Sequence, residues 1–238
     1  METLTIAPFE IGPKAIESLA GHGWSHGEIA RTAIGCALFN YLNRMADGLG
    51  IRLDYPASGE FKTRDPEPVG APREASIAPQ QGVDDSSRNS SALDPDAFFA
   101  RAFAFAPGAI ALGKDWREYH FTESPRLSAG LRARLALYSA GLTFSTTSAR
   151  WARTRAAALG ISCERLDALE RGTPDATDAF ETLLFEHARR LTTEAWTTRY
   201  EHIESLLAAG LDERDIVKFT MLLAYLSFEQ RVTTARLA

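Results

Sequence analysis

A run of small hydroxyl side chains is the first feature of this sequence that could do chemistry. Residues 143–148 read Thr-Phe-Ser-Thr-Thr-Ser. Small side chains at a helix start let a ligand reach the free backbone N–H groups and the positive end of the helix dipole. The same residue types are common helix caps and turn formers, and this structural interpretation stays open. As an acyl-transfer nucleophile, Ser145 or Ser148 would need a base, for which His120 and His187 are the candidates.

The two cysteines, Cys36 and Cys163, are far apart in the sequence and form no Cys-x-x-Cys motif. This usage is typical of a reducing compartment without a disulfide framework. Cys36 lies among apolar residues within an expected helix, which favours a buried, inert thiol. Cys163 lies near an expected helix start, a place that favours thiol reactivity in general, but it has no resolving partner.

Histidine and carboxylate spacing does not indicate a metal site. His22 and His26 lie on either side of a glycine turn, so their spacing does not place them on one helix. Glu186 and His187 are sequence neighbours and would face different sides of a helix. The Gly-His-Gly turn at residues 21–23 is too short for a nucleotide-binding loop. We expect neither a metal nor another cofactor.

Another group of polar side chains falls on one face of the first long helix. Asn40, Asn43, Arg44 and Asp47 recur at helical spacing. They predict a buried polar network or an arginine–carboxylate pair that ties parts of the fold together, with Arg231 as a further member. A ligand-binding role is the alternative.

The elements that carry these residues are all expected to be helices. Ser25 and Glu28 have the spacing of a capping box, at the start of a helix that ends near Gly48. Ser124 and Pro125 are typical of a helix start. Further helices are expected over residues 13–20, 107–119, 149–159, 162–169, 173–190 and 193–209, and from residue 212 to the C-terminus. No segment alternates with period two, so the predicted fold class is all-α.

Composition narrows the classes of partner. The chain has 238 residues, a formal net charge of −5 and a pI near 5.6, which speak against a nucleic-acid surface. The first ten residues lack the pattern of a signal peptide. The most apolar stretch, residues 97–112, contains Arg101 and Pro107 and is too short to span a bilayer. We expect a cytoplasmic protein with no nucleic-acid or membrane partner.

Residues 54–95 differ from the rest of the chain. They are rich in proline, serine and glycine and contain few large apolar residues, so they predict a long loop without a core of its own. This loop separates an N-terminal helical repeat at residues 1–53 from residues 96–238, which hold the central helices and a C-terminal repeat. All parts together are expected to form one compact domain. Several phenylalanines at residues 98–105 indicate core or a subunit interface.

The two ends of the chain resemble each other. Ala-Ile-Glu-Ser-Leu at residues 15–19 returns as His-Ile-Glu-Ser-Leu at residues 202–206, a shift of 187 positions. Without a gap, the same shift places Gly23 on Gly210 and Arg44 on Arg231. This register predicts a duplicated unit of a short helix, a glycine turn and a capped long helix.

A family resemblance rests on two segments. Residues 38–50 read Leu-Phe-Asn-Tyr-Leu-Asn-Arg-Met-Ala-Asp-Gly-Leu-Gly, and residues 209–211 form an Ala-Gly-Leu turn. The chain resembles the carboxymuconolactone decarboxylase and alkylhydroperoxidase D (AhpD)-like superfamily, in particular its long, two-part peroxidase-related members. The resemblance covers most of the chain outside residues 54–95. It implies an AhpD-like helical fold, with two helical-hairpin repeats around a central helix pair, and assembly as a homo-oligomer.

The resemblance also implies where a reactive site would lie. Redox-active members are alkylhydroperoxidases with peroxiredoxin-type activity, whose central helix pair carries a Glu, a Cys-x-x-Cys motif and a His. One thiolate attacks the peroxide and the other resolves it as a disulfide. Counted from Gly160, these positions fall on Ala133, Ser145, Ser148 and Ala152 in this chain. A serine hydroxyl has no oxidation ladder like that of a thiol, so the family chemistry cannot run here.

Three hypotheses for function follow. The first is a redox-inactive binding or partner subunit, with a catalytically intact paralogue as one partner. The second is a non-thiol enzyme, decarboxylase-like or isomerase-like, that holds a small organic acid in a pocket formed by Ser145, Ser148, Arg150 and Trp151. The third is a peroxidase that uses Cys36 or Cys163.

Overall fold

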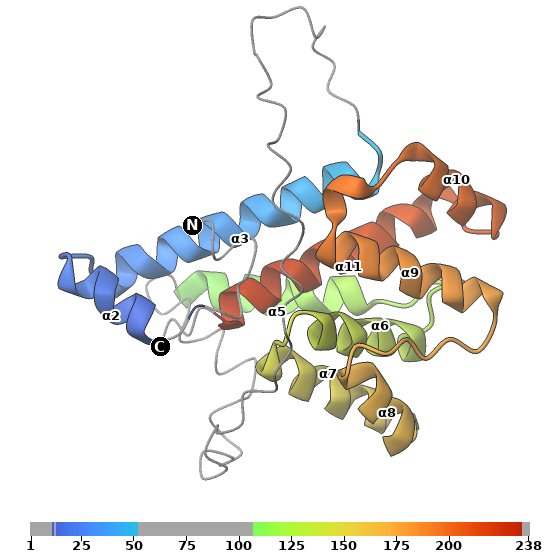
Figure 1. The fold of residues 1–238 in the computed structure, drawn as a ribbon, viewed down its shortest axis with the longest axis horizontal. Helices are drawn as coiled ribbons and strands as arrows, with labels where there is room; N and C mark the ends of the chain where they lie inside the picture. The colour runs from blue at the N-terminus through green and yellow to red at the C-terminus, as the bar shows by residue number, and fades with distance from the viewer. Residues whose placement is uncertain (1–10, 12, 52–106, 235–238) are drawn as a thin grey trace, which may run out of the picture. The chain divides into compact units, whose positions relative to one another are not determined.

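The computed structural model describes residue 11 and residues 13–51 and 107–234 (Figure 1). Within these ranges every regular element is a helix and no strand occurs, which confirms the all-α fold class. No helix in this part of the chain is long and apolar enough to cross a membrane. The expected loop at residues 54–95 and the phenylalanines at residues 98–105 lie outside the described residues.

From α5 onward the helices follow one another with short connections. In chain order they are α2 (Pro13–Gly21), α3 (His26–Gly48), α5 (Pro107–Phe121), α6 (Ala129–Leu142), α7 (Thr146–Ala158), α8 (Cys163–Glu170), α9 (Ala179–Thr193), the 3-10 helix η3 (Ala195–Thr197), α10 (Tyr200–Ala208) and α11 (Glu213–Thr234).

The two long helices, α3 and α11, lie side by side and run in opposite directions (Figure 1). Thr220, near the start of α11, donates a hydrogen bond from its hydroxyl to the carbonyl of Gly48 at the end of α3 (3.4 Å). A Cβ atom on Gly48 would lie 2.5 Å from the Thr220 methyl group. The absence of a side chain at Gly48 therefore permits this close approach.

The structure repeats its first hairpin at its end. Helix α10 begins at Tyr200, 187 positions after the start of α2 at Pro13. Helix α11 begins at Glu213, again 187 positions after the start of α3 at His26. The turn between the helices contains a glycine with positive φ in both copies, Gly23 (91°) and Gly210 (95°). The short helix, the turn and the start of the long helix thus agree with the register expected from the sequence.

Helix α6 is the centre of the remaining helices. It packs against α5, α7, α8, α9 and α11, and residues 131–141 are all buried. A helix covered on every side needs small residues where neighbours come close. Gly141 shows this, since a Cβ atom there would lie 2.6 Å from the Leu169 carbonyl oxygen at the end of α8.

Four helix starts differ from expectation by three residues or more. Helix α7 begins at Thr146 instead of residue 149, so the last residues of the hydroxyl run belong to it. Ser124 does not cap α6; Ser128 does, because residues 124–127 close a tight turn in which Leu127 N–H donates to the Ser124 carbonyl (3.1 Å). Pro125 is therefore a turn residue. Helix α9 begins at Ala179 instead of residue 173. Asp178 caps it by accepting a hydrogen bond from Glu181 N–H (2.8 Å). Residues 193–199 hold only η3, and α10 starts at Tyr200.

Candidate functional site

The hydroxyl run connects α6 to α7 through a tight helix end. Ser145 N–H donates to the Ala140 carbonyl (3.0 Å) and Phe144 N–H to the Gly141 carbonyl (3.3 Å), which is the pattern of a Schellman motif. Phe144 holds the left-handed position of this motif with φ of 53°, where glycine is usual. Ser145 then occupies the N-cap position of α7, and its side chain makes no capping hydrogen bond.

Both serines of the hydroxyl run are buried. The exposed fractions of Ser145 and Ser148 are 3% and 4%. Their hydroxyls lie 3.5 Å and 3.4 Å from the hydroxyl oxygen of Thr233, near the end of α11. Because Thr233 donates its own proton to the Gln230 carbonyl (3.1 Å), it accepts from the serines. The three hydroxyls thus satisfy one another and the backbone, without a base among them.

The other two positions taken from the family motif are apolar and buried. Ala133 on α6 is 0% exposed and Ala152 on α7 is 1% exposed. No group that could relay a proton stands at either position. The two serine hydroxyls are therefore the only polar side-chain groups at these four positions.

Arg150 and Trp151, expected beside the serines, are half-buried. Trp151 packs edge-on against Phe121 at the end of α5, with ring centroids 4.8 Å apart. The guanidinium groups of Arg117 and Arg155 lie 5.3 Å and 5.5 Å from the Trp151 ring. Trp151 thus belongs to an aromatic and cationic cluster between α5 and α7.

The two candidate bases do not join the serines. His120 stacks on Tyr225 with ring centroids 4.8 Å apart, and His187 packs against Phe219 at 5.6 Å. Burial lowers the pKa of each histidine to about 4, helped by the charge of Arg132 at His120 and by His202 and Arg190 at His187. Both imidazoles are therefore neutral at pH 7.

The two thiols lie on different helices and no disulfide joins them. Cys36 is half-buried in α3, where its sulfur accepts a long hydrogen bond from the Asn40 amide (3.7 Å). Cys163 is exposed as the first residue of α8. No resolving cysteine stands beside either thiol, because the chain has only these two.

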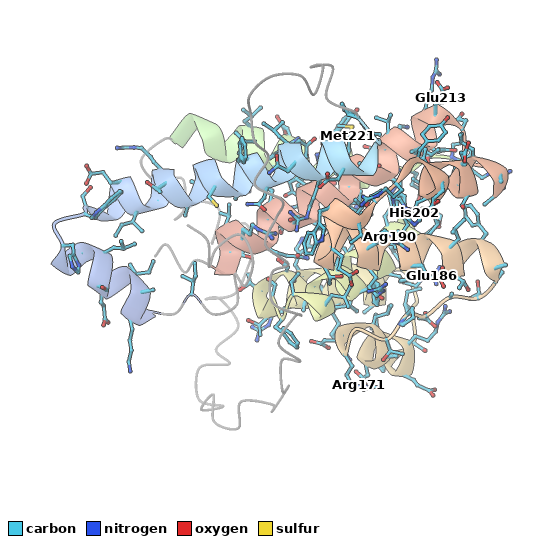
Figure 2. All side chains as sticks on the ribbon, turned by 45° about the horizontal axis from the view of Figure 1, so that its top comes forward. Arg171, Glu186, Arg190, His202, Glu213 and Met221 are labelled. Atoms are coloured by element: carbon cyan, nitrogen blue, oxygen red, sulfur yellow. The ribbon has the colours of Figure 1, made fainter. Side chains whose placement is uncertain are left out.

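Among the described residues, no group of three or more His, Cys, Asp or Glu side chains could hold a metal ion. Glu186, labelled in Figure 2, is exposed on α9. Its neighbour His187 is buried, so the pair does not form one ligand set. His22 donates from Nδ1 to the Ser18 carbonyl (2.6 Å) and thereby belongs to the end of α2.

The polar face of α3 forms a network around Arg44, which is 8% exposed. Arg44 donates to the carbonyls of Leu191 (3.0 Å) and Thr192 (3.2 Å) in the last turn of α9, and to the Asn40 side chain (3.2 Å). Its partners are thus backbone acceptors and an amide. Asp47 is half-buried, and burial raises its pKa against the opposing effect of Arg44 and Arg199. Asn43 is exposed.

Arg231 repeats the local bonding of Arg44. It donates to the carbonyl of Ser227 (3.1 Å) and to the Ser227 hydroxyl, one turn earlier, as Arg44 does to Asn40. Burial lowers the pKa of Arg44 to about 10. Burial and the positive charge of Arg44 together lower the pKa of Arg231 to about 9. The two arginines thus stand close enough to repel each other across the α3–α11 pair.

Sequence reasoning missed a second buried polar cluster, between α5 and α11. Arg117 donates to the Tyr225 hydroxyl (3.3 Å), and its guanidinium lies 3.6 Å from a carboxylate oxygen of Glu229. Burial and the charge of Glu229 raise the pKa of Tyr225 well above its usual range. Only the spacing of Tyr225 and Glu229 on one helical face could have indicated a cluster, because Arg117 reaches it from another helix.

Comparisons of the chain with protein-family models, with curated proteins and with solved structures gave no match.

Proposed function

We propose that this protein is a redox-inactive, AhpD-like binding or partner subunit. The observation that carries the proposal is the composition of the joint between α6 and α7. The positions that would hold two thiols, a glutamate and a histidine in a peroxidatic relative are occupied by Ser145, Ser148, Ala133 and Ala152, all of them buried.

The contacts of the serines support a structural role for this joint. A peroxidatic site needs a thiolate that a peroxide can reach and a base or acid for the proton. Ser145 and Ser148 instead direct their hydroxyls at Thr233 on α11. The repeat of α2–α3 by α10–α11 supports the AhpD-like arrangement of two hairpins around the pair α6 and α7.

The same contacts speak against the non-thiol enzyme. A decarboxylase-like or isomerase-like site built from Ser145, Ser148, Arg150 and Trp151 requires serine hydroxyls that touch a substrate. Their exposed fractions of 3% and 4% leave no such access. The contacts of the serines thus favour the binding or partner role over the enzyme.

We further propose that the protein is a cytoplasmic homo-oligomer. The absence of a disulfide between Cys36 and Cys163 fits a reducing compartment. The outer face of α3 supports the oligomer, since Leu38, Phe39 and Leu42 are 44%, 65% and 53% exposed. Apolar side chains gathered on one helix face are typical of a protein interface.

The test of redox inactivity is turnover of an organic hydroperoxide with a dithiol reductant. The wild-type protein is compared with the double variant Cys36→Ser/Cys163→Ser. We expect both proteins to match the rate without protein. Turnover in the wild type that disappears in the double variant would overturn the proposal and place the reactive thiol at Cys36 or Cys163.

A variant that restores the four motif positions tests the assignment of the joint. Ala133→Glu, Ser145→Cys, Ser148→Cys and Ala152→His are combined in one chain. We expect the two new thiols to form an intramolecular disulfide under mild oxidation, measured by mass spectrometry after alkylation. If they remain fully alkylated after oxidation, these positions do not correspond to a Cys-x-x-Cys site.

A further inference from the structure

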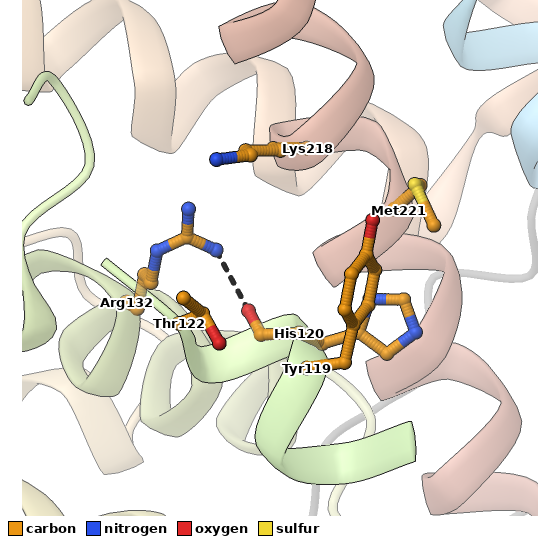
Figure 3. A pocket seen from close by; sticks show the side chains of 6 residues that line it. All are labelled: Tyr119, His120, Thr122, Arg132, Lys218 and Met221. Atoms are coloured by element: carbon orange, nitrogen blue, oxygen red, sulfur yellow. Dashed lines mark hydrogen bonds between the residues drawn. The ribbon is translucent and has the colours of Figure 1, made fainter. Parts of the chain in front are cut away.

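A small cavity lies where the end of α5, the first turns of α6 and the first half of α11 meet. It has a volume of about 60 Å³ and is lined by Tyr119, His120, Thr122, Arg132, Lys218 and Met221 (Figure 3). A volume of this size holds several water molecules or one small polar group. The cavity is separate from the buried serines, none of which lines it.

Arg132 is the unusual wall of this cavity because it is 1% exposed. It donates from Nε to the Leu127 carbonyl (3.0 Å) and from one terminal nitrogen, Nη1, to the His120 carbonyl (2.7 Å). The other terminal nitrogen, Nη2, is buried without a hydrogen-bond partner. A buried guanidinium nitrogen that lacks an acceptor destabilises the fold, so an acceptor in the cavity would stabilise it.

Lys218 adds a second positive charge on the opposite wall. Figure 3 shows the Lys218 amine and the guanidinium of Arg132 directed into the same space, while the ring of His120 points away from it. Lys218 forms no salt bridge within the described part of the chain. Two cations that converge on one small cavity favour an anion over a neutral ligand.

Nearby carboxylates do not neutralise this pair by direct contact. Asp215 and Glu123 act on Arg132 through their charge, but no ion pair joins either of them to Arg132 among the described residues. Asp215 lines a neighbouring cavity instead. No carboxylate is among the described residues that line the small cavity.

The neighbouring cavity gives a ligand room to extend. It has a volume of about 420 Å³ and shares Lys218 with the small cavity. Ser124, Arg126, Asp212 and Arg214 are among the residues that line it. The hydroxyl of Ser124 is buried without a hydrogen-bond partner. This volume is in the range of small-molecule sites.

We propose that the space between Arg132 and Lys218 is a binding site for an oxyanion group, the carboxylate or phosphate of a small metabolite whose remainder lies in the neighbouring cavity. Arg132 Nη2 and the Lys218 amine donate to the anionic oxygens. The site does not rest on the family resemblance or on the loss of the thiols. It holds or fails separately from the function proposed above.

The experiment measures thermal unfolding at constant ionic strength while chloride is replaced by inorganic phosphate, acetate or hexanoate. A ligand that binds only the folded state raises Tm with its concentration. The variants are Lys218→Met, which removes one anion contact, and Lys14→Met, which removes an exposed lysine on α2. The control variant corrects for the general stabilisation of proteins by phosphate.

We expect an oxyanion to raise the Tm of the wild type and of Lys14→Met alike, and we expect Lys218→Met to weaken the apparent affinity roughly tenfold or more. A larger effect of phosphate than of acetate assigns a phosphate group. A larger effect of hexanoate than of acetate assigns an organic acid that reaches the neighbouring cavity. Equal shifts in all three proteins, or no shift beyond that of chloride, would overturn the site.

Discussion

Buried arginines in this chain satisfy the ends of helices. Arg44 donates to carbonyls in the last turn of α9, and Arg132 donates to the His120 carbonyl in the last turn of α5. The last carbonyls of a helix have no partner within the helix, and a guanidinium group can supply several donors at once. Arg44 therefore joins helices that are distant in sequence, whereas Arg132 joins two consecutive helices, and both donate to backbone carbonyls.

Two buried histidines make the stability of the fold dependent on pH. The pKa of His120 and of His187 is lowered to about 4 by burial, whereas an unfolded histidine titrates near its ordinary value of 6.5. At pH values between these two pKa values, the unfolded chain binds more protons than the folded chain. The histidines therefore leave the stability of the fold unreduced above about pH 6.5 and lower it as the pH drops toward 4. We expect a loss of about 2 kcal/mol per histidine from pH 7 to pH 5, measured by urea denaturation.

The control for this prediction is an exposed histidine. His22→Gln should keep the full pH dependence, because His22 is exposed, and His187→Leu should lose about half of it. The carboxylate of Glu181 does not contribute in this window. Its burial would raise its pKa, but hydrogen bonds from Arg134 and Thr177 lower it to about 2, so its effect is lost only below pH 4.5. A flat profile from pH 7 to pH 5 would contradict the burial of both imidazoles.

Sequence reasoning at the residue scale succeeded where the relevant partners are local. The capping box of Ser25 and Glu28 is present, and Asp212 caps α11 by accepting from Asp215 N–H (2.7 Å). Arg44 was expected in a buried network and lies in one, but its partners Leu191 and Thr192 could not be named. They are almost 150 positions away, and no local pattern encodes that pairing.

At the scale of elements, two glycines of α6 have opposite roles. Gly141 faces the end of α8, where an added Cβ atom would lie 2.6 Å from the Leu169 carbonyl oxygen and 2.7 Å from that of Glu170. Gly130, in the first turn of the same helix, has no atom within 4 Å of an added Cβ. The same substitution therefore tests close packing at one site and helix propensity at the other.

We expect Gly141→Ala to destabilise the protein by roughly 2 kcal/mol or more, because the contact atoms are backbone and cannot move aside alone. Gly130→Ala should stabilise it by about 0.5–1 kcal/mol, since alanine loses less chain entropy in a helix than glycine does. Both free energies of unfolding are measured by denaturant titration. Equal effects of the two substitutions would contradict the close packing of α6 on α8.

The helices themselves were largely predictable, and their starts less so. Periodic apolar residues indicate α3, α6 and α11, and Gly160 indicates the end of α7. Ser124 and Pro125 looked like a helix start because the same residue types also begin turns, and tertiary contacts decided between the two. The Arg132 cavity was not predictable, since its lining residues come from α5, α6 and α11.

At the scale of the whole molecule, the two repeats are covered differently. Tyr225, Leu226 and Glu229 on α11 are buried, and α5 packs against this helix. The residues at the equivalent positions of α3 are Leu38, Phe39 and Leu42, which are 44%, 65% and 53% exposed. The first repeat thus exposes an apolar face at the place where the second repeat is buried.

If the proposed homo-oligomer forms, this face is where we expect its subunits to meet. Phe39→Asp places a charge in the centre of the face, and we expect it to lower the oligomer mass to that of the monomer at micromolar concentration, because a buried unpaired charge opposes association. Sedimentation equilibrium measures the change. Leu159→Asp, at the end of α7, is the matched control and should leave the mass unchanged. If both variants keep the wild-type mass, subunits meet elsewhere or not at all.

The pairing of α3 with α11 also has a consequence for the order of folding. A ribosome completes α3 at residue 48, whereas the helix that packs along it begins only at residue 213. During synthesis, the apolar residues of α3 that will face α11 have no native partner. Contacts of such long sequence separation form late and slowly. The hairpin of α2 and α3 therefore stays without this cover while every described helix from α5 to α10 is synthesised.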